Sequence, residues 1–315
     1  AYYTLNLLQK MKNSSWFVVI NPKAGSGKAK KIWEKTKKEL TRLEVSFDYS
    51  ISEYAGHEQE ISKNAVVNGY SQIISIGGDG TTQKVVRGVY MQDKIPAKNV
   101  LLGVIPSGTG NDWIKSHGIP LDYKKALSIV IKKKTKTQDL GKIEVLGNKP
   151  GVYHFINYAG AGFDCFVLSR LKQYKKFGPL SYFLCAIANF MKFKNIPVTI
   201  ELDALKIKSS VFLLGVGLCS FTGGGMRLTK DADPFDGYFN ITVAQDFTKF
   251  DIIKNLPKLF NGGIFKDKKV FTYKSKKVKI FSAKEGVVSQ IDGEVLEKGS
   301  LVYSIVKGGF TFCSP

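Results

Sequence analysis

The chain has 315 residues, of which 43% are hydrophobic, and it carries a formal net charge of +21. This length allows two domains of ordinary size, and no apolar stretch approaches the ~18–20 residues of a membrane-spanning helix. The positive charge favours a polyanionic partner, whether nucleic acid, an anionic membrane or phosphate compounds, without deciding among them.

Residues 16–140 alternate between strand and helix patterns in the manner of an α/β domain. The predicted strands are Trp16–Ile20, Val45–Ser50, Gln72–Ile76 and Leu101–Ile105, and the predicted helices are Lys28–Leu43, His57–Asn68, Thr82–Met91 and Asp122–Lys133. Residues 1–10 are interpreted as a leader or expression remnant that precedes Met11. The pattern predicts a parallel sheet with its ligands at the carboxyl ends of the strands.

From about Thr137 the sequence changes to short strand patterns separated by turn residues. One helical segment, Phe166 to Lys194, interrupts them, and the rest predicts a β-rich second domain, either a sandwich or a barrel. The four cysteines and three histidines lie too far apart for a metal cluster, so we expect a reducing compartment.

The first candidate phosphate turn lies in "VVINPKAGSGKAKKIW", residues 18–33. It is no Walker A motif, because Ala29 stands where the hydroxyl is required and Pro22 where the first glycine is required. A strand, the glycines Gly25 and Gly27, and a helix N-terminus can still bind an anion through backbone amides. On this stretch alone, a basic surface turn is an equally good interpretation.

The second turn, in "IISIGGDGTTQKVVRG" (residues 73–88), is the most informative. Its three glycines leave backbone amides accessible, and Thr81 can cap the following helix and offer its hydroxyl to a phosphate. Asp79 would weaken phosphate binding unless it binds a divalent cation or transfers a proton. A glycine-rich hairpin is the alternative, and the strand before the turn and the helix pattern after it argue against that alternative.

The third turn, in "VIPSGTGNDW" (residues 104–113), again places hydroxyls and glycines at a strand end. Three such turns would converge at one edge of a parallel sheet, which favours a phosphate site.

These motifs, N-P-x-x-G-x-G, G-G-D-G-T and P-x-G-T-x-N-D, resemble in order and spacing the diacylglycerol kinase catalytic domain family, which includes bacterial diacylglycerol kinases and the related sphingosine and ceramide kinases. The later segments "GAGFD" (160–164), "DADPFDGYFNI" (231–241) and "QIDGE" (290–294) are similar to further motifs of that family. The resemblance therefore extends from Phe17 to Phe312. G-G-D-G-T alone also occurs in NAD kinases and resembles phosphofructokinase loops.

The resemblance implies an ATP-dependent lipid kinase with a phosphofructokinase-like α/β domain, a β-sandwich-like domain and an active site in the cleft between them. The nucleotide-binding domain would cover residues 11–137, with the tail 308–315 packing back on it. The lipid-substrate domain would cover residues 138–307, with a helical insertion at 166–194.

The resemblance also assigns site residues. ATP would lie against Asn21, Gly25, Gly77, Gly78, Gly80, Thr81, Ser107, Gly108 and Thr109. The substrate would lie near Asn111 and Asp112. Asp292 and Glu294 would approach the reacting hydroxyl and the metal. We take Asp292 as the general base, because a strand would hold it rigidly, with Asp79 as the competing candidate.

Magnesium would be bound by carboxylates, for which Asp79, Asp112, Asp292 and Glu294 are the candidates. The run Asp231, Asp233 and Asp236 offers a second site, and a comparable site is structural in relatives; an acidic surface turn is nearly as good an interpretation. The family commonly reads G-G-D-G-T-x-x-E, whereas this chain has Lys84 in the last place, so the contacts to the nucleotide or headgroup at that position stay open.

The segment 165–195 has basic ends and an apolar middle, which suits a lipid entrance at a headgroup boundary; a core-packing helix pair is the alternative. Its basic residues Lys172, Lys175, Lys176, Lys192 and Lys194 are the expected membrane contacts. We thus expect a cytoplasmic enzyme at the inner face of the membrane that converts diacylglycerol to phosphatidic acid. A sphingoid base, ceramide or a phosphatidylglycerol-like acceptor stays open, as does a homodimer.

Two other classes of function remain. An NAD kinase-like enzyme would share G-G-D-G-T, although the third turn and the late D-G-E favour the lipid branch. A non-enzymatic polyanion- or membrane-binding protein fits the charge. We expect no nucleic-acid partner, because no RRM, KH or helix-turn-helix pattern is visible and acidic residues lie in the expected site.

Overall fold

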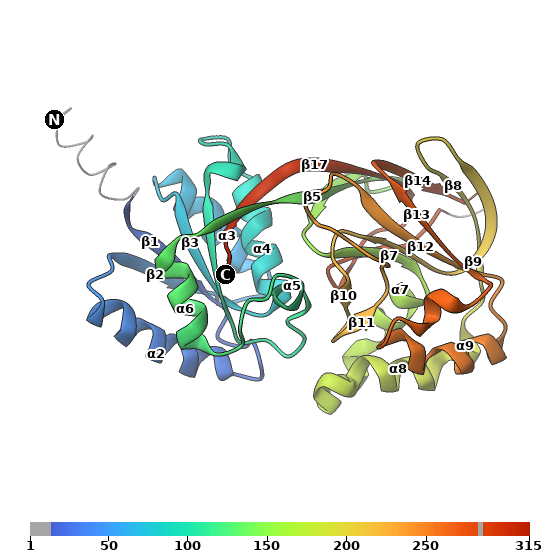
Figure 1. The fold of residues 1–315 in the computed structure, drawn as a ribbon, viewed down its shortest axis with the longest axis horizontal. Helices are drawn as coiled ribbons and strands as arrows, with labels where there is room; N and C mark the ends of the chain where they lie inside the picture. The colour runs from blue at the N-terminus through green and yellow to red at the C-terminus, as the bar shows by residue number, and fades with distance from the viewer. Residues whose placement is uncertain (1–13, 283–285) are drawn as a thin grey trace. The chain divides into compact units, whose positions relative to one another are not determined.

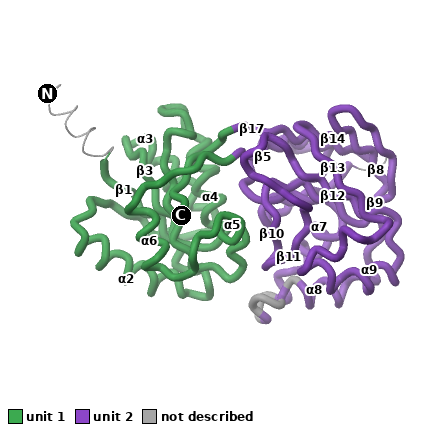
Figure 2. The backbone as a smooth tube through the Cα atoms, viewed as in Figure 1, with its two compact units in different colours: residues 1–138, 308–315 green, residues 139–307 purple. Residues whose placement is uncertain are grey.

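The computed structural model describes residues 14–282 and 286–315, which form two compact units (Figures 1 and 2). Unit 1 comprises the described residues up to Gln138 together with Gly308–Pro315, and unit 2 comprises Asp139–Lys307. The chain passes between the units within strands β5 (Thr135–Leu146) and β17 (Ser300–Cys313). The interpretation of residues 1–10 as a remnant concerns residues outside the described part of the chain.

Unit 1 contains a parallel sheet in the order β4-β3-β1-β2, extended beside β4 by Thr311 and Phe312 of β17. Its strands are β1 (Trp16–Ile20), β2 (Phe47–Ile51), β3 (Gln72–Gly77) and β4 (Leu101–Pro106). Its helices are α2 (Lys28–Arg42), α3 (His57–Val67), α4 (Asp79–Tyr90), η1 (Ala97–Asn99), α5 (Asp112–Ser116) and α6 (Tyr123–Lys132). Strand β3 is buried along its whole length, as expected for the centre of a sheet covered on both faces.

The core of unit 1 explains why the sequences of its central strands are continuous apolar runs. One face of the sheet packs Ile74 and Ile76 against α2 and α6, through Trp33 and Leu127 among others. On the other face, Ile73 and residues of α4 line a common apolar space. The sequence therefore had to be apolar on both sides of each central strand.

Two details of unit 1 differ from the sequence prediction. Helix α4 begins at Asp79 and not at Thr82, because the Gly78 carbonyl accepts hydrogen bonds from the N–H groups of Thr81 and Thr82 (3.0 and 3.1 Å). The short helix α5 was not predicted at all. Both differences lie at strand ends, where helical turns follow the glycines directly.

Unit 2 is built mainly from antiparallel strands in the order β16-β15-β7-β9-β8-β14-β17, with β12 paired to β9 and β13, and β6 to β5. Its other strands are β6 (Gly151–Phe155), β7 (Tyr158–Gly162), β8 (Ile196–Glu201), β9 (Lys206–Gly217), β10 (Phe221–Thr222), β11 (Met226–Arg227), β12 (Phe239–Gln245), β13 (Val270–Ser275), β14 (Lys277–Phe281), β15 (Ser289–Ile291) and β16 (Glu294–Val295). The predicted combination of an α/β domain with a β-sandwich-like domain is confirmed.

Two helical segments interrupt the strands of unit 2 (Figure 1). The first consists of α7 (Phe163–Leu168), η2 (Leu171–Leu180), α8 (Ser181–Asn189) and η3 (Phe190–Lys192), where a helical insertion was predicted. The second consists of α9 (Lys249–Asn255), η4 (Pro257–Leu259) and η5 (Gly263–Lys266), and the sequence analysis missed it. Its helices are short and interrupted by proline and glycine, so no helical period is visible.

Within the described residues, no helix is both long enough and apolar enough to cross a membrane. All four cysteines are buried free thiols.

Candidate active site

In unit 1 the three glycine turns predicted from the sequence lie together at the carboxyl ends of β1, β3 and β4. The side-chain amide of Asn21 donates to the Thr81 hydroxyl (3.1 Å), which joins the first turn to the second. The Ser107 N–H donates to the Gly77 carbonyl (2.7 Å), which joins the third turn to the second. The three turns therefore form one structure.

Glycine is required where the turns touch. A Cβ on Gly25, whose φ is +59°, would lie 1.9 Å from the Ser107 carbonyl oxygen. A Cβ on Gly108 would lie 2.4 Å from the Gly78 Cα. Gly80 differs, since a Cβ there would have no atom within 4 Å. The contacts that Gly25 and Gly108 make between the turns thus depend on the absence of a side chain, while Gly80 faces open space.

The third turn also holds an unsatisfied polar group. The Ser107 hydroxyl is buried and has no hydrogen-bond partner among the described residues. Buried hydroxyls in proteins normally have a partner, so a ligand or water is expected at this atom. Nearby, the Asn111 side chain donates to the Gly108 carbonyl (2.6 Å) and so rigidifies the turn. Thr109 is exposed.

Asp79 connects the second turn to the start of α5. Its carboxylate accepts hydrogen bonds from the backbone N–H groups of Asp112 (2.7 Å) and Trp113 (3.2 Å). Burial, helped by the charge of Asp112, raises the pKa of Asp79 to about 6 against the opposing effects of the two N–H donors and Lys115. A carboxyl group with a pKa close to neutrality suits proton transfer.

Asp112 itself is nearly fully buried and forms an ion pair with Lys115 (3.3 Å). Asp79 and Asp112 therefore bring two acidic groups to the place where the second and third turns meet.

In unit 2, Asp292 is held by the backbone. Its carboxylate accepts three hydrogen bonds from the consecutive N–H groups of Ile156, Asn157 and Tyr158, at 2.8–3.1 Å. Its φ is +46°, and the next residue, Gly293, has a φ of +88°. Asp292 thus fixes a tight turn from which the half-buried Glu294 of β16 follows.

Asn157 belongs to the same cluster, and the sequence analysis missed it. Its side-chain N–H donates to the Phe221 carbonyl (2.9 Å), while its side-chain oxygen is buried with no hydrogen-bond partner in the described part of the chain. Its place four residues ahead of Ala161, in the approach to "GAGFD", was the only signal that could have drawn attention to it.

The acidic run of unit 2 faces a lysine. Asp236 forms an ion pair with Lys274 (2.8 Å). The pKa of Lys274 is raised, first by this hydrogen bond and further by the charges of Asp236, Asp233 and Asp231, while desolvation opposes the shift. Throughout residues 14–282 and 286–315, no group of three or more His, Cys, Asp or Glu side chains is poised for a metal ion. The second metal site at Asp231 and Asp236 stays a prediction.

Comparison with known proteins identifies both halves of the chain. Residues 15–143 match the family described as diacylglycerol kinase catalytic domain, and residues 157–311 match the YegS C-terminal NAD kinase beta sandwich-like domain. A diacylglycerol kinase of Bacillus subtilis is 30% identical over 291 residues, covering 88% of both chains. One of Staphylococcus carnosus is 28% identical over 281 residues, covering 88% of this chain and 87% of the relative.

Solved structures agree on the fold. A crystal structure of a diacylglycerol kinase from Bacillus anthracis superposes with a TM-score of 0.71 at 21% identity, covering 96% of this chain and 97% of that one.

Proposed function

Because the chain belongs to the diacylglycerol kinase catalytic domain family, we propose that it transfers the γ-phosphoryl group of ATP to the hydroxyl of a membrane lipid, with diacylglycerol as the acceptor and phosphatidic acid as the product. The observation that carries the proposal is the joining of three glycine turns at the strand ends of unit 1.

The nucleotide site is assigned to these turns. Phosphoryl transfer asks a protein mainly to position the phosphates and to neutralise their charge. Backbone amides around Gly25, Gly78 and Gly108 are the proposed donors, and the unpartnered Ser107 hydroxyl is a further donor. Asn21, Gly77, Gly80, Thr81 and Thr109 complete the proposed set.

Mg²⁺ fits the acidic pair of unit 1. Mg²⁺ in kinases is usually bound by one or two carboxylates together with phosphate oxygens and water. Asp112 would be the carboxylate ligand; its charge raises the pKa of Asp79, a repulsion that a divalent cation bound to Asp112 would relieve. When bound, the ion would neutralise charge on the phosphates.

Asp79 is our proposed proton acceptor. The oxygen of the lipid hydroxyl attacks the γ-phosphorus, the bond from that phosphorus to the β–γ bridging oxygen breaks, and ADP leaves. The hydroxyl proton passes to Asp79, whose pKa of about 6 leaves it mostly ionised at neutral pH.

The sequence favours Asp292 as the base. Its oxygens accept three backbone N–H groups, which leaves little capacity for a substrate proton. We therefore assign Asp292 to positioning the turn that carries Glu294, and Glu294 to the acceptor side of the reaction.

The lipid acceptor is supported by an apolar cavity in unit 2. The free space of this cavity is small, about 20 Å³, and its lining includes Phe163, Phe212, Met226, Leu228, Ile252 and Leu256. The lining is apolar apart from Asn255, so it suits a hydrocarbon chain better than a nucleotide, and a chain would have to part these side chains to enter.

The test is transfer of ³²P from γ-labelled ATP to a panel of acceptors: diacylglycerol, ceramide and sphingosine in mixed micelles, and NAD⁺ in solution. We expect labelled phosphatidic acid. Label in NAD⁺ alone would assign the NAD kinase-like function, and label in a different lipid would correct the acceptor. Failure to label any acceptor, with the protein folded, would leave the binding-protein interpretation.

A further inference from the structure

The helix α9 presents apolar side chains outward. Phe250 and Ile253 are 74% and 57% exposed. They lie three residues apart and thus on one face of the helix, whereas Ile252 and Asn255, also three residues apart, are buried. A single exposed apolar side chain is ordinary, whereas several that adjoin one another mark a candidate interaction surface.

The exposed face of α9 is continuous with the end of the first helical segment. The Lys249 ammonium donates to the carbonyls of Phe190 (2.9 Å) and Phe193 (2.5 Å), which ties the start of α9 to η3. Phe183 of α8 packs edge-on against Phe260, with ring centroids 6.2 Å apart.

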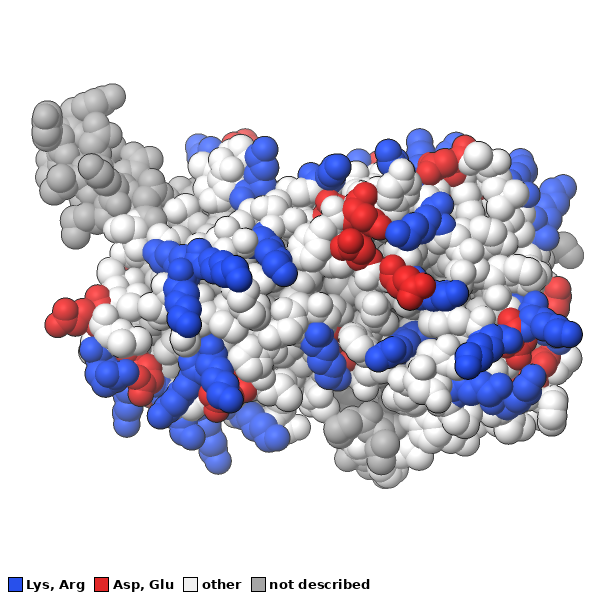
Figure 3. All heavy atoms as spheres, viewed as in Figure 1, with Lys and Arg blue, Asp and Glu red and all other residues white. Residues whose placement is uncertain are grey.

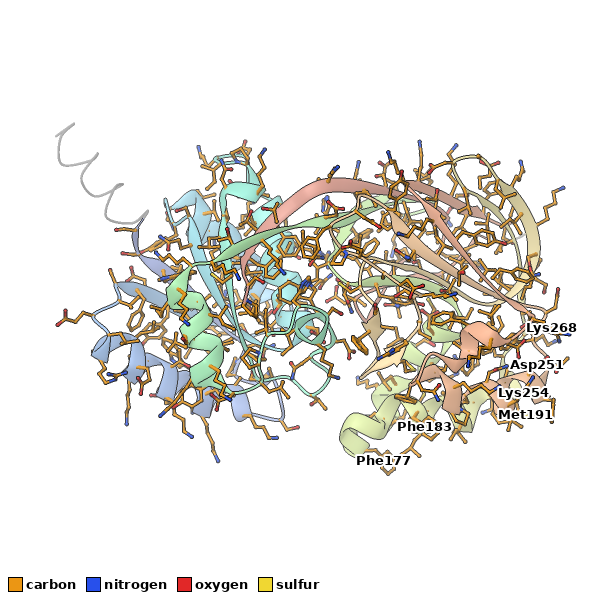
Figure 4. The ribbon with its side chains drawn as sticks, viewed as in Figure 1. Phe177, Phe183, Met191, Asp251, Lys254 and Lys268 are labelled. Carbon is orange, nitrogen blue, oxygen red and sulfur yellow. The ribbon has the colours of Figure 1, made fainter. Side chains whose placement is uncertain are left out.

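We call the resulting patch the α8–α9 surface and define it by four exposed residues, Met191, Phe250, Ile253 and Phe260. Figure 4 shows Met191 and Lys254 at the end of unit 2 where α8 and α9 lie, with Phe177 and Phe183 on the same side.

The two helical segments that carry this surface are strongly basic. Residues 166–194 and 247–269 contain twelve Lys and Arg and only two acidic residues, Asp251 and Asp267. Both acids are paired, Asp251 with Lys269 (2.6 Å) and Asp267 with Lys254 (3.4 Å). Basic side chains also outnumber acidic ones over unit 2 near α8 and α9 in Figure 3.

We propose that the α8–α9 surface docks on an anionic lipid bilayer, with Phe250 and Ile253 entering the interface and Lys258, Lys266 and Lys268 contacting the headgroups. Exposed aromatic and aliphatic groups bordered by lysines, with the acids neutralised internally, match the chemistry of such an interface. The inference rests on the proposed lipid kinase function, and it names the surface by which the enzyme reaches its substrate.

The buried face of the α9 segment lines the apolar cavity of unit 2. Ile252, Leu256 and Leu259 line the apolar cavity beneath the helical segment, while Phe250 and Ile253 point away from it. The same short segment thus separates the proposed bilayer contact from the small apolar cavity, and docking would bring that cavity next to the hydrocarbon of the bilayer.

The test is sedimentation of the full chain with sucrose-loaded vesicles of phosphatidylcholine, with and without phosphatidylglycerol. Phe250→Ala combined with Ile253→Ala should lower the partition coefficient for the anionic vesicles by about tenfold or more. Lys258→Gln, Lys266→Gln and Lys268→Gln together should lower it on the order of 100-fold at low salt, with the difference shrinking in 0.5 M NaCl.

Two matched control variants remove apolar groups and positive charges from surfaces away from α9. Leu146→Ala with Val152→Ala removes exposed apolar groups from strands β5 and β6 of unit 2, and Lys124→Gln, Lys125→Gln and Lys132→Gln together remove exposed charge from α6. Both should bind vesicles as the unchanged protein does. If the controls lose as much binding as the α9 variants, or if the unchanged protein does not bind anionic vesicles, the proposal is overturned and a protein partner becomes the occupant to seek.

A direct probe is Phe250→Trp. Its fluorescence should shift to shorter wavelength with anionic vesicles and be quenched by bromine-labelled acyl chains; binding without quenching would exclude insertion of α9. These measurements do not need catalysis, so vesicle binding through α9 without lipid phosphorylation would refute the proposed function and keep the docking surface. Phosphorylation of a short-chain, dispersed diacylglycerol should be unchanged in the α9 variants.

Discussion

Asp79 accepts a 2.7 Å hydrogen bond from the backbone N–H of Asp112, and this bond opposes the burial that raises the pKa of Asp79 to about 6. Asp79 therefore both holds the start of α5 beside the second glycine turn and, because it is buried, has a pKa of about 6 that suits a proton acceptor. This double role makes Asp79 the most informative position for testing the proposed mechanism.

Replacing Asp79 with asparagine should lower kcat by about 10²–10⁴-fold, because the amide keeps the shape but cannot accept the proton. One of its two backbone hydrogen bonds can be retained by the amide oxygen, so ATP affinity should change little. Steady-state kinetics and equilibrium binding of ATP separate the two effects. A near-normal kcat would remove Asp79 from the role of base.

The pH dependence of the reaction follows from the same group. If Asp79 accepts the proton, kcat should rise with pH around its pKa of about 6 and level off above it. The free energy of unfolding should change with pH in the opposite direction to kcat. The folded protein holds this proton more tightly than the unfolded chain, whose carboxyl has the ordinary value of 3.8, so this contribution to stability decreases as pH rises between about 4 and about 6. Urea unfolding at several pH values checks this, and Asp79→Asn should remove that part of the slope.

The sequence predicted unit 1 well because its signals are local. The strand Gln72–Gly77 is a short apolar run followed directly by glycines, and each phosphate turn is contained within about ten residues. The resemblance to a kinase family adds the order of the motifs, and membership in that family is confirmed.

The contacts that the sequence could not predict join residues far apart in the chain. Asp292 meets its N–H donors across 134–136 residues, and Asp236 meets Lys274 across 38 residues. The spacing of these residues carries no period, so only the fold brings them together. Helix α9 was missed for a different reason, since Phe250 and Ile253 face outward and do not mark a core-facing stripe.

The glycines at which the turns touch one another should tolerate no side chain. Gly25→Ala would place a methyl group 1.9 Å from the Ser107 carbonyl oxygen, and Gly78→Val would push against Gly108, whose Cα lies 3.0 Å from the place that a Cβ would take. Both variants should lose ATP binding, measured by calorimetry, while unit 2 keeps its strand content. Gly80→Ala adds the same methyl group in open space within α4 and should leave thermal stability unchanged or slightly higher. ATP affinity unchanged in Gly78→Val would contradict the assignment of the second turn.

The ion pair between Lys274 and Asp236 makes a prediction about metal binding in unit 2. Lys274→Gln removes the ammonium group that neutralises the acidic run, so a divalent cation gains access to Asp231 and Asp236. We expect Mg²⁺ to raise the Tm of this variant more than that of the unchanged protein. The exposed Lys208→Gln serves as the control for loss of one positive charge. An equal response in all three proteins would argue against a metal site at the acidic run.

Variants at Asp292 distinguish the two hypotheses for the general base, Asp79 and Asp292. If Asp292 is a positioning residue, Asp292→Asn should lower the free energy of unfolding by about 1–2 kcal/mol. The amide N–H₂ group would then face backbone N–H donors where the carboxylate had an acceptor oxygen. Asparagine tolerates the left-handed conformation at φ +46°, so backbone strain contributes little. Asp292→Ala should cost more, since no acceptor remains, and kcat should fall in proportion to the loss of stability across the two variants. If Asp292→Asn instead slowed turnover by about 10²-fold or more, with unfolding by urea unchanged and Asp79→Asn still active, Asp292 would be the proton acceptor.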